Sequence, residues 1–197
     1  MKRILLVLLL IFSMVICLPS CNGNIEENPE FAKFNEMFNK DFENYTITVD
    51  TTSYNGDTLN NKYVISTVDG KKTVTYRVET LNEFTVDNNN LIAPESYKNI
   101  VEGTQSLDSM KYNDDLAPYI HCIVPHFNFS YSCLSSDIIT PVSFKANITS
   151  LNGFMKLNVE ATDATVSVEF SGETVDSIEI SYVTTAENTV VIKYVFN

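Results

Sequence analysis

The feature that most constrains the fold is a period-two alternation of apolar and polar side chains. In residues 45–50, Tyr45, Ile47 and Val49 alternate with polar residues, and similar segments recur along the rest of the chain. Such alternation is typical of strands with one buried face. Short turn sequences separate these segments, and short turns join antiparallel strands, whereas parallel strands need long crossovers. The sequence therefore predicts an α+β, mainly β fold built on a curved antiparallel sheet, or half-barrel.

The predicted strands form two groups. The first contains residues 45–54 and a hairpin over residues 61–81, which turns at Asp69-Gly70, a pair suited to a tight hairpin. A short strand at residues 83–86 follows. The second group comprises residues 120–131, 140–151, 154–161, 164–170, 175–183 and 188–196. Consecutive strands joined in this way favour an antiparallel meander.

An amphipathic helix is predicted before the strands. Asn28 is suited to the N-cap and Pro29 to the first helical position. Four aromatic residues then recur at helical spacing on one face: Phe31, Phe34, Phe38 and Phe42. This stripe either packs directly on the sheet or borders a cavity for an apolar ligand. Under the second alternative, the four phenylalanines and Tyr76 are the candidate cavity residues.

A second helical region is predicted between the two groups of strands. Residues 91–119 lose the alternation, and Pro94 begins a stretch that favours a short helix ending at Gly103. Another short helix or turn is expected near residues 107–110. We expect this insertion and the N-terminal helix to cover one face of the sheet, so that residues 29–197 form a single domain.

The first 28 residues have the pattern of an export signal followed by a tether. Lys2 and Arg3 precede an apolar core that is too short for a typical bilayer span. The core ends in Leu18-Pro19-Ser20-Cys21, which resembles the lipobox of bacterial lipoproteins. This resemblance implies cleavage after residue 20, lipidation of Cys21 and a polar tether over residues 21–28. Ordinary signal-peptidase cleavage and an uncleaved anchor remain the alternatives.

The charge of the mature chain restricts its partners. Loss of residues 1–20 removes Lys2 and Arg3 from the 13 basic residues and none of the 25 acidic ones, which leaves a formal net charge of −14. Such a surface repels nucleic acid and anionic lipid headgroups. We therefore expect no nucleic-acid partner, and we expect the acylated Cys21 to hold the protein at the membrane in an extracytoplasmic location.

The order of elements resembles that of the LolA-like and LppX-type half-barrel lipid and lipoprotein carriers. The resembling segments are the aromatic helix leading into residues 45–50, the Asp69-Gly70 hairpin and the closing strands of residues 166–196. The resemblance implies a curved sheet wrapped around helices, with a hydrophobic cavity for an acyl chain. It covers most of residues 30–197 and rests on the pattern of elements, so it assigns no binding residue.

Two further cysteines, Cys122 and Cys133, lie on the arms of a possible hairpin in the segment HCIVPHFNFSYSC. In an exported protein such a pair predicts a disulfide. Free thiols are an alternative. A zinc site with His121 and His126 is another, although adjacent residues of a strand point to opposite faces and no Cys-x-x-Cys pair is present.

Catalysis finds little support in the sequence. His121 and His126 are the only histidines, and no serine lies in a Gly-x-Ser-x-Gly elbow. Residues 135–137, Ser-Ser-Asp, are predicted to be hydrogen-bonded turn residues. We expect neither an enzyme nor a bound metal or cofactor.

These observations predict a lipid-anchored binding protein that holds a lipid or other apolar ligand between its sheet and its helices. The alternative is a surface lipoprotein without a ligand cavity, which serves as a protein-interaction or structural module and has an envelope protein as its partner.

Overall fold

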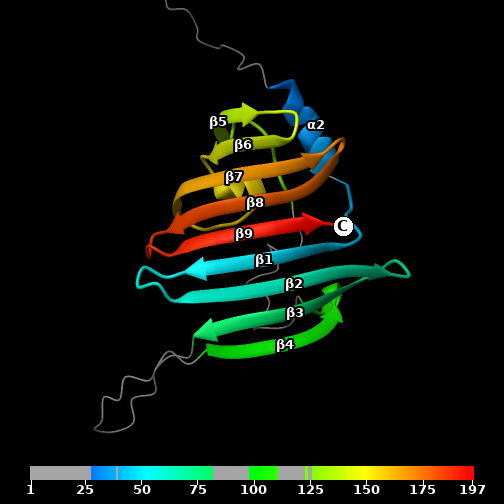
Figure 1. Ribbon diagram of the computed structural model, residues 1–197, viewed down its shortest axis with the longest axis vertical. Coiled ribbons are helices and arrows are strands. Elements are labelled where there is room, and N and C mark those ends of the chain that lie inside the picture. Colours follow the sequence, from blue (N-terminus) through cyan, green and yellow to red (C-terminus); the bar gives the residue numbers. More distant parts are fainter. Residues whose placement is uncertain (1–27, 39, 82–97, 111–122, 124–125) are drawn as a thin grey trace, which may run out of the picture.

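The computed structural model describes residues 28–38, 40–81, 98–110, 123 and 126–197. In these residues one large antiparallel sheet is accompanied by short helices (Figure 1). The helices are α2 (Pro29–Phe38), α3 (Leu107–Met110) and α5 (Leu151–Met155). The strands are β1 (Tyr45–Thr52), β2 (Thr58–Val68), β3 (Lys71–Leu81), β4 (Lys98–Ser106), β5 (Leu134–Ile139), β6 (Ser143–Ile148), β7 (Ala161–Ser171), β8 (Thr174–Thr184) and β9 (Thr189–Phe196).

The nine strands have the order β4-β3-β2-β1-β9-β8-β7-β6-β5, and every neighbouring pair is antiparallel. The sheet is not closed into a barrel, so β4 and β5 form its two edges. The predicted fold class, mainly β with a curved antiparallel sheet and a few short helices, is confirmed. The last strand, β9, lies in the middle of the sheet between β1 and β8.

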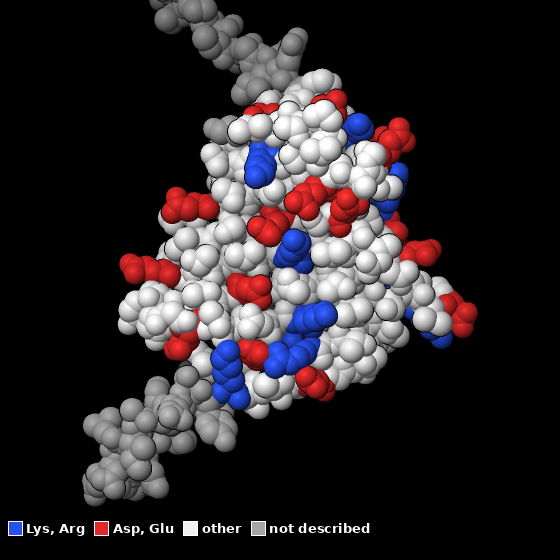
Figure 2. Space-filling model, in the orientation of Figure 1, with Lys and Arg blue, Asp and Glu red and all other residues white. Residues whose placement is uncertain are grey.

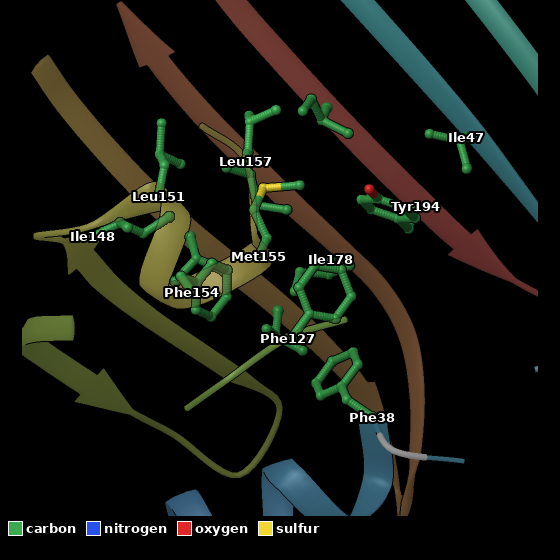
Figure 3. Packing of buried hydrophobic residues seen from close by; sticks show 14 of the residues in the cluster. Phe38, Ile47, Phe127, Ile148, Leu151, Phe154, Met155, Leu157, Ile178 and Tyr194 are labelled. Atoms are coloured by element: carbon green, nitrogen blue, oxygen red, sulfur yellow. The ribbon is translucent and has the colours of Figure 1, made fainter. Parts of the chain in front are cut away.

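One face of the sheet carries the apolar residues of the alternating strands. Ile47 lies opposite Tyr63 on one side and Tyr194 on the other, and all three are buried. Phe154 and other side chains of α5 join this core from the same face (Figure 3). Burial of apolar side chains is the main favourable term in folding. The alternation of the strands places these buried side chains on one side of the sheet.

Helix α2 begins as the sequence predicts. The side chain of Asn28 accepts a hydrogen bond of 3.0 Å from the backbone N–H of Glu30, which satisfies one of the free donors at the start of the helix. Pro29 occupies the first helical position. The helix ends at Phe38, however, so Phe42 lies beyond it and the predicted four-residue stripe is helical only over its first three members.

The predicted helix over the segment that ends at Gly103 is wrong, because residues 98–106 form the edge strand β4. Gly103 lies opposite Tyr76 in the pairing of β3 and β4. A Cβ atom at position 103 would lie 2.6 Å from the Tyr76 hydroxyl oxygen, so the tyrosine ring occupies the space that a side chain would need. The glycine marks close packing inside a strand, not a helix end. The short helix expected near residues 107–110 is present as α3.

The strand predicted over residues 120–131 is wrong where the structure describes it. Residues 126–129 have no strand partner, although Phe127 and Phe129 are buried in the core. Asn35 of α2 takes the place of a neighbouring strand for Phe129. Its Oδ1 accepts from the Phe129 N–H at 2.8 Å, and its Nδ2 donates to the Phe129 carbonyl at 2.9 Å. These two bonds satisfy a buried backbone that no ladder reaches.

Two further elements differ from the prediction. The strand predicted over residues 154–161 is replaced by the end of α5 and an irregular segment, with Ser150 as N-cap and Lys156 as a left-handed C-cap at φ 57°. Residues 134–139, expected to be partly turn, form the edge strand β5 beside β6. At the start of α5, the Ser150 side chain accepts a hydrogen bond from the Gly153 N–H, and this local bond favours the start of a helix over a continued strand.

The hairpin of β2 and β3 is confirmed. Asp69 and Gly70 both have positive φ, at 52° and 71°, as a two-residue turn of this kind requires. The strand predicted at residues 83–86 lies outside the described residues, as does most of the 91–119 insertion. In the described part of the chain, none of the helices combines the length and the apolar character that crossing a bilayer requires.

Candidate functional site

The aromatic side chains of α2 are fully used in the core. Phe31, Phe34 and Phe38 are 1%, 3% and 4% exposed. The Phe34 ring packs against three other rings, with centroid distances of 5.4 Å to Phe129 and 5.0 Å to Phe144. The Phe34 ring also stacks on the Phe170 ring, with a centroid distance of 5.4 Å. Rings at these distances attract one another in addition to their burial, so the helix is attached to the sheet through a packed aromatic cluster.

Two open grooves border α2 where it meets the ends of the strands. The first, which we call the hairpin groove, has a volume of about 390 Å³ and is lined by Glu30, Lys33, Phe34, Met37, Ile139, Thr140, Pro141, Phe170 and Gly172. The second, the C-terminal groove, has a volume of about 350 Å³ and is lined by Met37, Lys40, Phe42, Glu173, Thr174, Val175, Asp176, Phe196 and Asn197. Met37 is common to both grooves, so they lie end to end along the helix.

The five candidate cavity residues do not all border one of these two grooves. Phe34 borders the hairpin groove, and Phe42 borders the C-terminal groove, where its ring lies 4.1 Å from that of Phe196. Phe31 and Phe38 border neither of these grooves. Tyr76 lies on β3, far across the sheet order from β7 and β8, which border the grooves.

A third groove lies over β2, β3 and β4. This outer-face groove has a volume of about 500 Å³ and is lined by Lys62, Val64, Thr75, Tyr76, Arg77, Glu102, Gly103 and Thr104. Most of these residues alternate with the core residues, so the groove opens on the polar face. Figure 2 shows this face, with basic side chains gathered over the lower strands and acidic side chains more frequent above them. Three of the side chains that line the groove, Lys62, Arg77 and Glu102, are charged.

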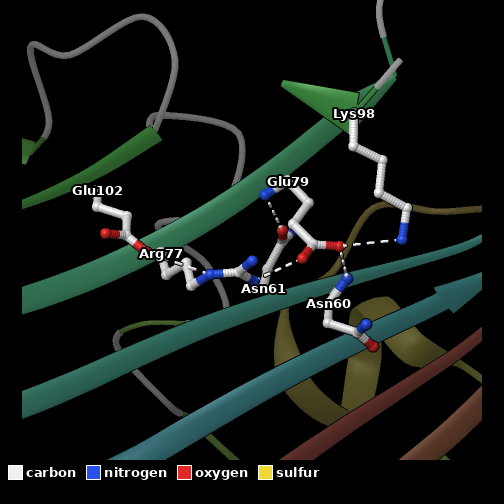
Figure 4. A network of polar contacts seen from close by, with 6 residues as sticks. All are labelled: Asn60, Asn61, Arg77, Glu79, Lys98 and Glu102. Carbon is white, nitrogen blue, oxygen red and sulfur yellow. Dashed lines mark hydrogen bonds and ion pairs between the residues drawn. The ribbon is translucent and has the colours of Figure 1, made fainter. Parts of the chain in front are cut away.

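Next to this groove, Glu79 is the centre of a polar network (Figure 4). The backbone pairing of β2 with β3 ends at Lys62 and Arg77. Beyond that point, side chains replace the ladder: a Glu79 carboxylate oxygen accepts from the Asn60 N–H at 3.0 Å, and Asn61 Oδ1 accepts from the Glu79 N–H at 2.7 Å. Glu79 thus closes a gap between two strands.

The charge of Glu79 is balanced from two sides. Arg77 Nη1 lies 2.5 Å from one carboxylate oxygen, and Lys98 Nζ lies 3.4 Å from the other. The Asn60 N–H, followed by these two cations, lowers the pKa of Glu79 below its ordinary value of 4.5. A carboxylate held ionised in this way is a weak base, so we assign it a structural role. The alternating pattern predicts only an exposed strand residue here, so the sequence carries no signal for this network.

Cys133 is buried, and its Sγ lies 3.0 Å from the carbonyl oxygen of Asn128. Its predicted disulfide partner, Cys122, lies outside the described residues, and the disulfide stays a prediction. Cys21 also lies outside them.

The residues weighed for catalysis or metal binding are not brought together in the described part of the chain. Asp137 accepts hydrogen bonds from Asn28 and, at 3.3 Å, from the Tyr131 hydroxyl, while His126 is exposed. Within the described residues no three His, Cys, Asp or Glu side chains cluster as a metal site. His121 lies outside those residues, and the expectation that the protein is not an enzyme stays a prediction.

Comparison with known proteins identifies no family. No protein-family model matches the chain, and no curated protein matches it significantly. The solved structures that match include a redesigned beta barrel, which is 9% identical over 77% of this chain and 89% of that chain, with a TM-score of 0.20. A similarity at that level supports no conclusion about fold or function.

Proposed function

We propose that the protein is a lipid-anchored extracytoplasmic module that binds an envelope protein at its surface and encloses no ligand between helix and sheet. One observation carries this proposal. The three helical phenylalanines that would line a deep cavity are at most 4% exposed and packed against other rings. A side chain that is packed in the core is not available to line a cavity for an acyl chain.

The anchor rests on the Leu18-Pro19-Ser20-Cys21 sequence and on the acidic surface, which does not favour adsorption to anionic lipid. Two or more acyl chains hold a protein stably at a bilayer. Replacement of the lipidated residue, Cys21→Ala, should move the protein from the membrane fraction to the soluble fraction. Cys17→Ala, four residues upstream, is the matched control and should stay membrane-bound. Equal membrane retention of both variants would contradict lipidation at Cys21.

The outer-face groove is the surface we assign to the partner. It includes residues of the edge strand β4, and Lys62, Arg77 and Glu102 present charges of both signs. Charged groups at such a surface favour one partner over others more than they add affinity. A protein with a complementary arrangement of charges is therefore the expected occupant.

Photocrosslinking tests this assignment in intact cells. A photoreactive residue at Thr104, in the groove, should form one discrete adduct with an envelope protein. The same residue at Glu187, in the exposed turn between β8 and β9, is the control and should not form that adduct. The substitution Lys62→Glu, at an exposed residue of the groove, should abolish the adduct at position 104. The same products at both positions, or no adduct at position 104, would contradict the proposal.

The second candidate is a carrier of a small apolar ligand, as the half-barrel resemblance implies. The grooves beside α2 favour it, because each falls within the usual volume range of ligand sites and carries apolar side chains such as Met37. Native mass spectrometry of the folded Cys21→Ala protein distinguishes the candidates. A bound lipid that is lost in Met37→Glu supports the carrier, and the polypeptide mass alone supports the interaction module.

A further inference from the structure

An apolar tip projects from the edge of the sheet at the turn between β5 and β6. All five residues of the segment Ile138-Ile139-Thr140-Pro141-Val142 are exposed, and four of the five are apolar. Ile138 is 64% exposed, and Val142 is 65% exposed. Single exposed apolar residues are common on soluble proteins, whereas a contiguous group of them marks a contact surface.

Hydrogen bonds hold the backbone of this tip in place. The Thr140 N–H donates to the Ser143 carbonyl at 2.8 Å, and the Ser143 N–H donates to Thr140 Oγ1 at 3.0 Å. The Phe170 N–H of β7 donates to the Val142 carbonyl at 3.0 Å, which ties the tip to the sheet. A rigid tip with its polar groups satisfied loses little conformational freedom when it enters an apolar medium.

The tip lies close to the point where the tether joins the domain. Asn28 Nδ2 donates to Asp137 Oδ2 at 3.0 Å, and Ile138 follows Asp137 directly. Figure 1 shows the start of α2 beside the β5–β6 hairpin. The seven residues between Cys21 and Pro29 can span at most about 25 Å when fully extended. A bilayer that holds Cys21 is therefore within reach of the tip.

We propose that the tip formed by Ile138, Ile139, Pro141 and Val142 inserts into the membrane surface to which Cys21 is anchored. This inference rests on the proposed lipidation, which supplies the attachment. The acyl chains hold the protein, and the tip fixes which end of the sheet faces the lipid. Because the mature chain is strongly acidic, contact through apolar side chains is the mode of membrane approach that its charge permits.

The charged groups around the tip are compatible with this orientation. Glu30 and Lys33 of α2 line the hairpin groove beside it and form an ion pair at 3.9 Å. The side chain of Lys33 is 60% exposed and that of Glu30 is 46% exposed, so both can remain among the headgroups while the tip enters the apolar layer. Asp137 is engaged by Asn28 and Tyr131 and does not face the lipid alone.

The chain contains no tryptophan, so a single tryptophan reports on its own surroundings. We would purify the lipidated protein with Val142→Trp and reconstitute it into phosphatidylcholine vesicles, some with brominated acyl chains. The fluorescence should shift to the blue, and bromine should quench at least half of it. Tyr54→Trp, at a 79% exposed position in the β1–β2 turn, is the matched control and should give water-like, unquenched emission.

Two measurements test the insertion of the tip and the lipidation of Cys21 separately. The mass of the purified N-terminal fragment reports lipidation of Cys21, and quenching reports insertion of the tip. Lipidated protein with equal quenching at positions 54 and 142 would contradict insertion of the tip and still support lipidation of Cys21. Protein without acyl mass would overturn both. Ile138→Trp serves as a second probe should Val142→Trp lose its β-sheet circular dichroism.

Discussion

The carboxylate of Glu79 on β3 accepts a 3.0 Å hydrogen bond from the backbone N–H of Asn60 on β2, a position that a backbone carbonyl occupies in an uninterrupted ladder. The acid therefore replaces part of the sheet. Since its side chain is 7% exposed and paired with Arg77 and Lys98, its charge contributes directly to the strength of the contact between the two strands.

The first prediction concerns how the stabilising effect of Glu79 depends on pH. The pKa of Glu79 is lower in the folded protein than in the unfolded chain, so its stabilising effect is fully present above pH 4.5 and is lost as the pH falls through the lowered value. Glu79→Gln should reduce the free energy of unfolding at pH 7 by about 2 kcal/mol, and the difference from the wild type should shrink below pH 4. Urea unfolding across pH measures this, with exposed Glu160→Gln as control. A constant difference at all pH values would contradict it.

The second prediction concerns Asn35. Asn35→Ala removes both hydrogen bonds to the Phe129 backbone and leaves a buried N–H and a buried carbonyl without those bonds. The free energy of unfolding should fall by about 2–3 kcal/mol. Asn152→Ala, on the exposed side of α5, should change it by less than about 0.5 kcal/mol. Equal effects of the two variants in thermal unfolding would refute the role of Asn35.

The third prediction concerns the aromatic cluster. Phe34→Ala should lower the free energy of unfolding by about 3–5 kcal/mol, because the removed ring contacts three others and leaves a cavity. The neighbouring Lys33→Ala, on the exposed side of α2, serves as the control. A loss below about 1 kcal/mol for Phe34→Ala would mean that the helix does not depend on the stripe.

The fourth prediction concerns the pair of Tyr76 and Gly103. Gly103→Ala should destabilise the fold by about 1–2 kcal/mol, since the new methyl group displaces the tyrosine ring. In a Tyr76→Ala background the same change should cost less than about 0.5 kcal/mol. This double-mutant cycle isolates their interaction. Additive effects would show that the ring does not cover the glycine.

Local patterns predicted the elements whose hydrogen bonds are local. The Asp69-Gly70 hairpin and the Asn28-Pro29 helix start depend on residues within a few positions of one another, and both are confirmed. The closing strands β7, β8 and β9 were also found, because their alternation is strong and their turns are short.

The structure differs from the sequence prediction where a partner distant in the sequence decides the local conformation. The extended segment around Phe129 has the pattern of a strand, but its hydrogen-bonding partner is the side chain of Asn35, 94 positions earlier. Gly103 suggested a helix end because no sequence signal places it against Tyr76. Neither the Glu79 network nor the packing of Phe34 could be predicted, since both depend on which strands become neighbours.

The central position of β9 has a consequence for biogenesis. Strands β1–β4 can pair with one another as soon as they emerge, but β1 and β8 meet only through β9. During synthesis the two half-sheets therefore stay apart until β9 has been made. Pairings between segments so far apart along the chain form slowly. Completion of the sheet therefore depends on the strand that is made after all the others in the described part of the chain.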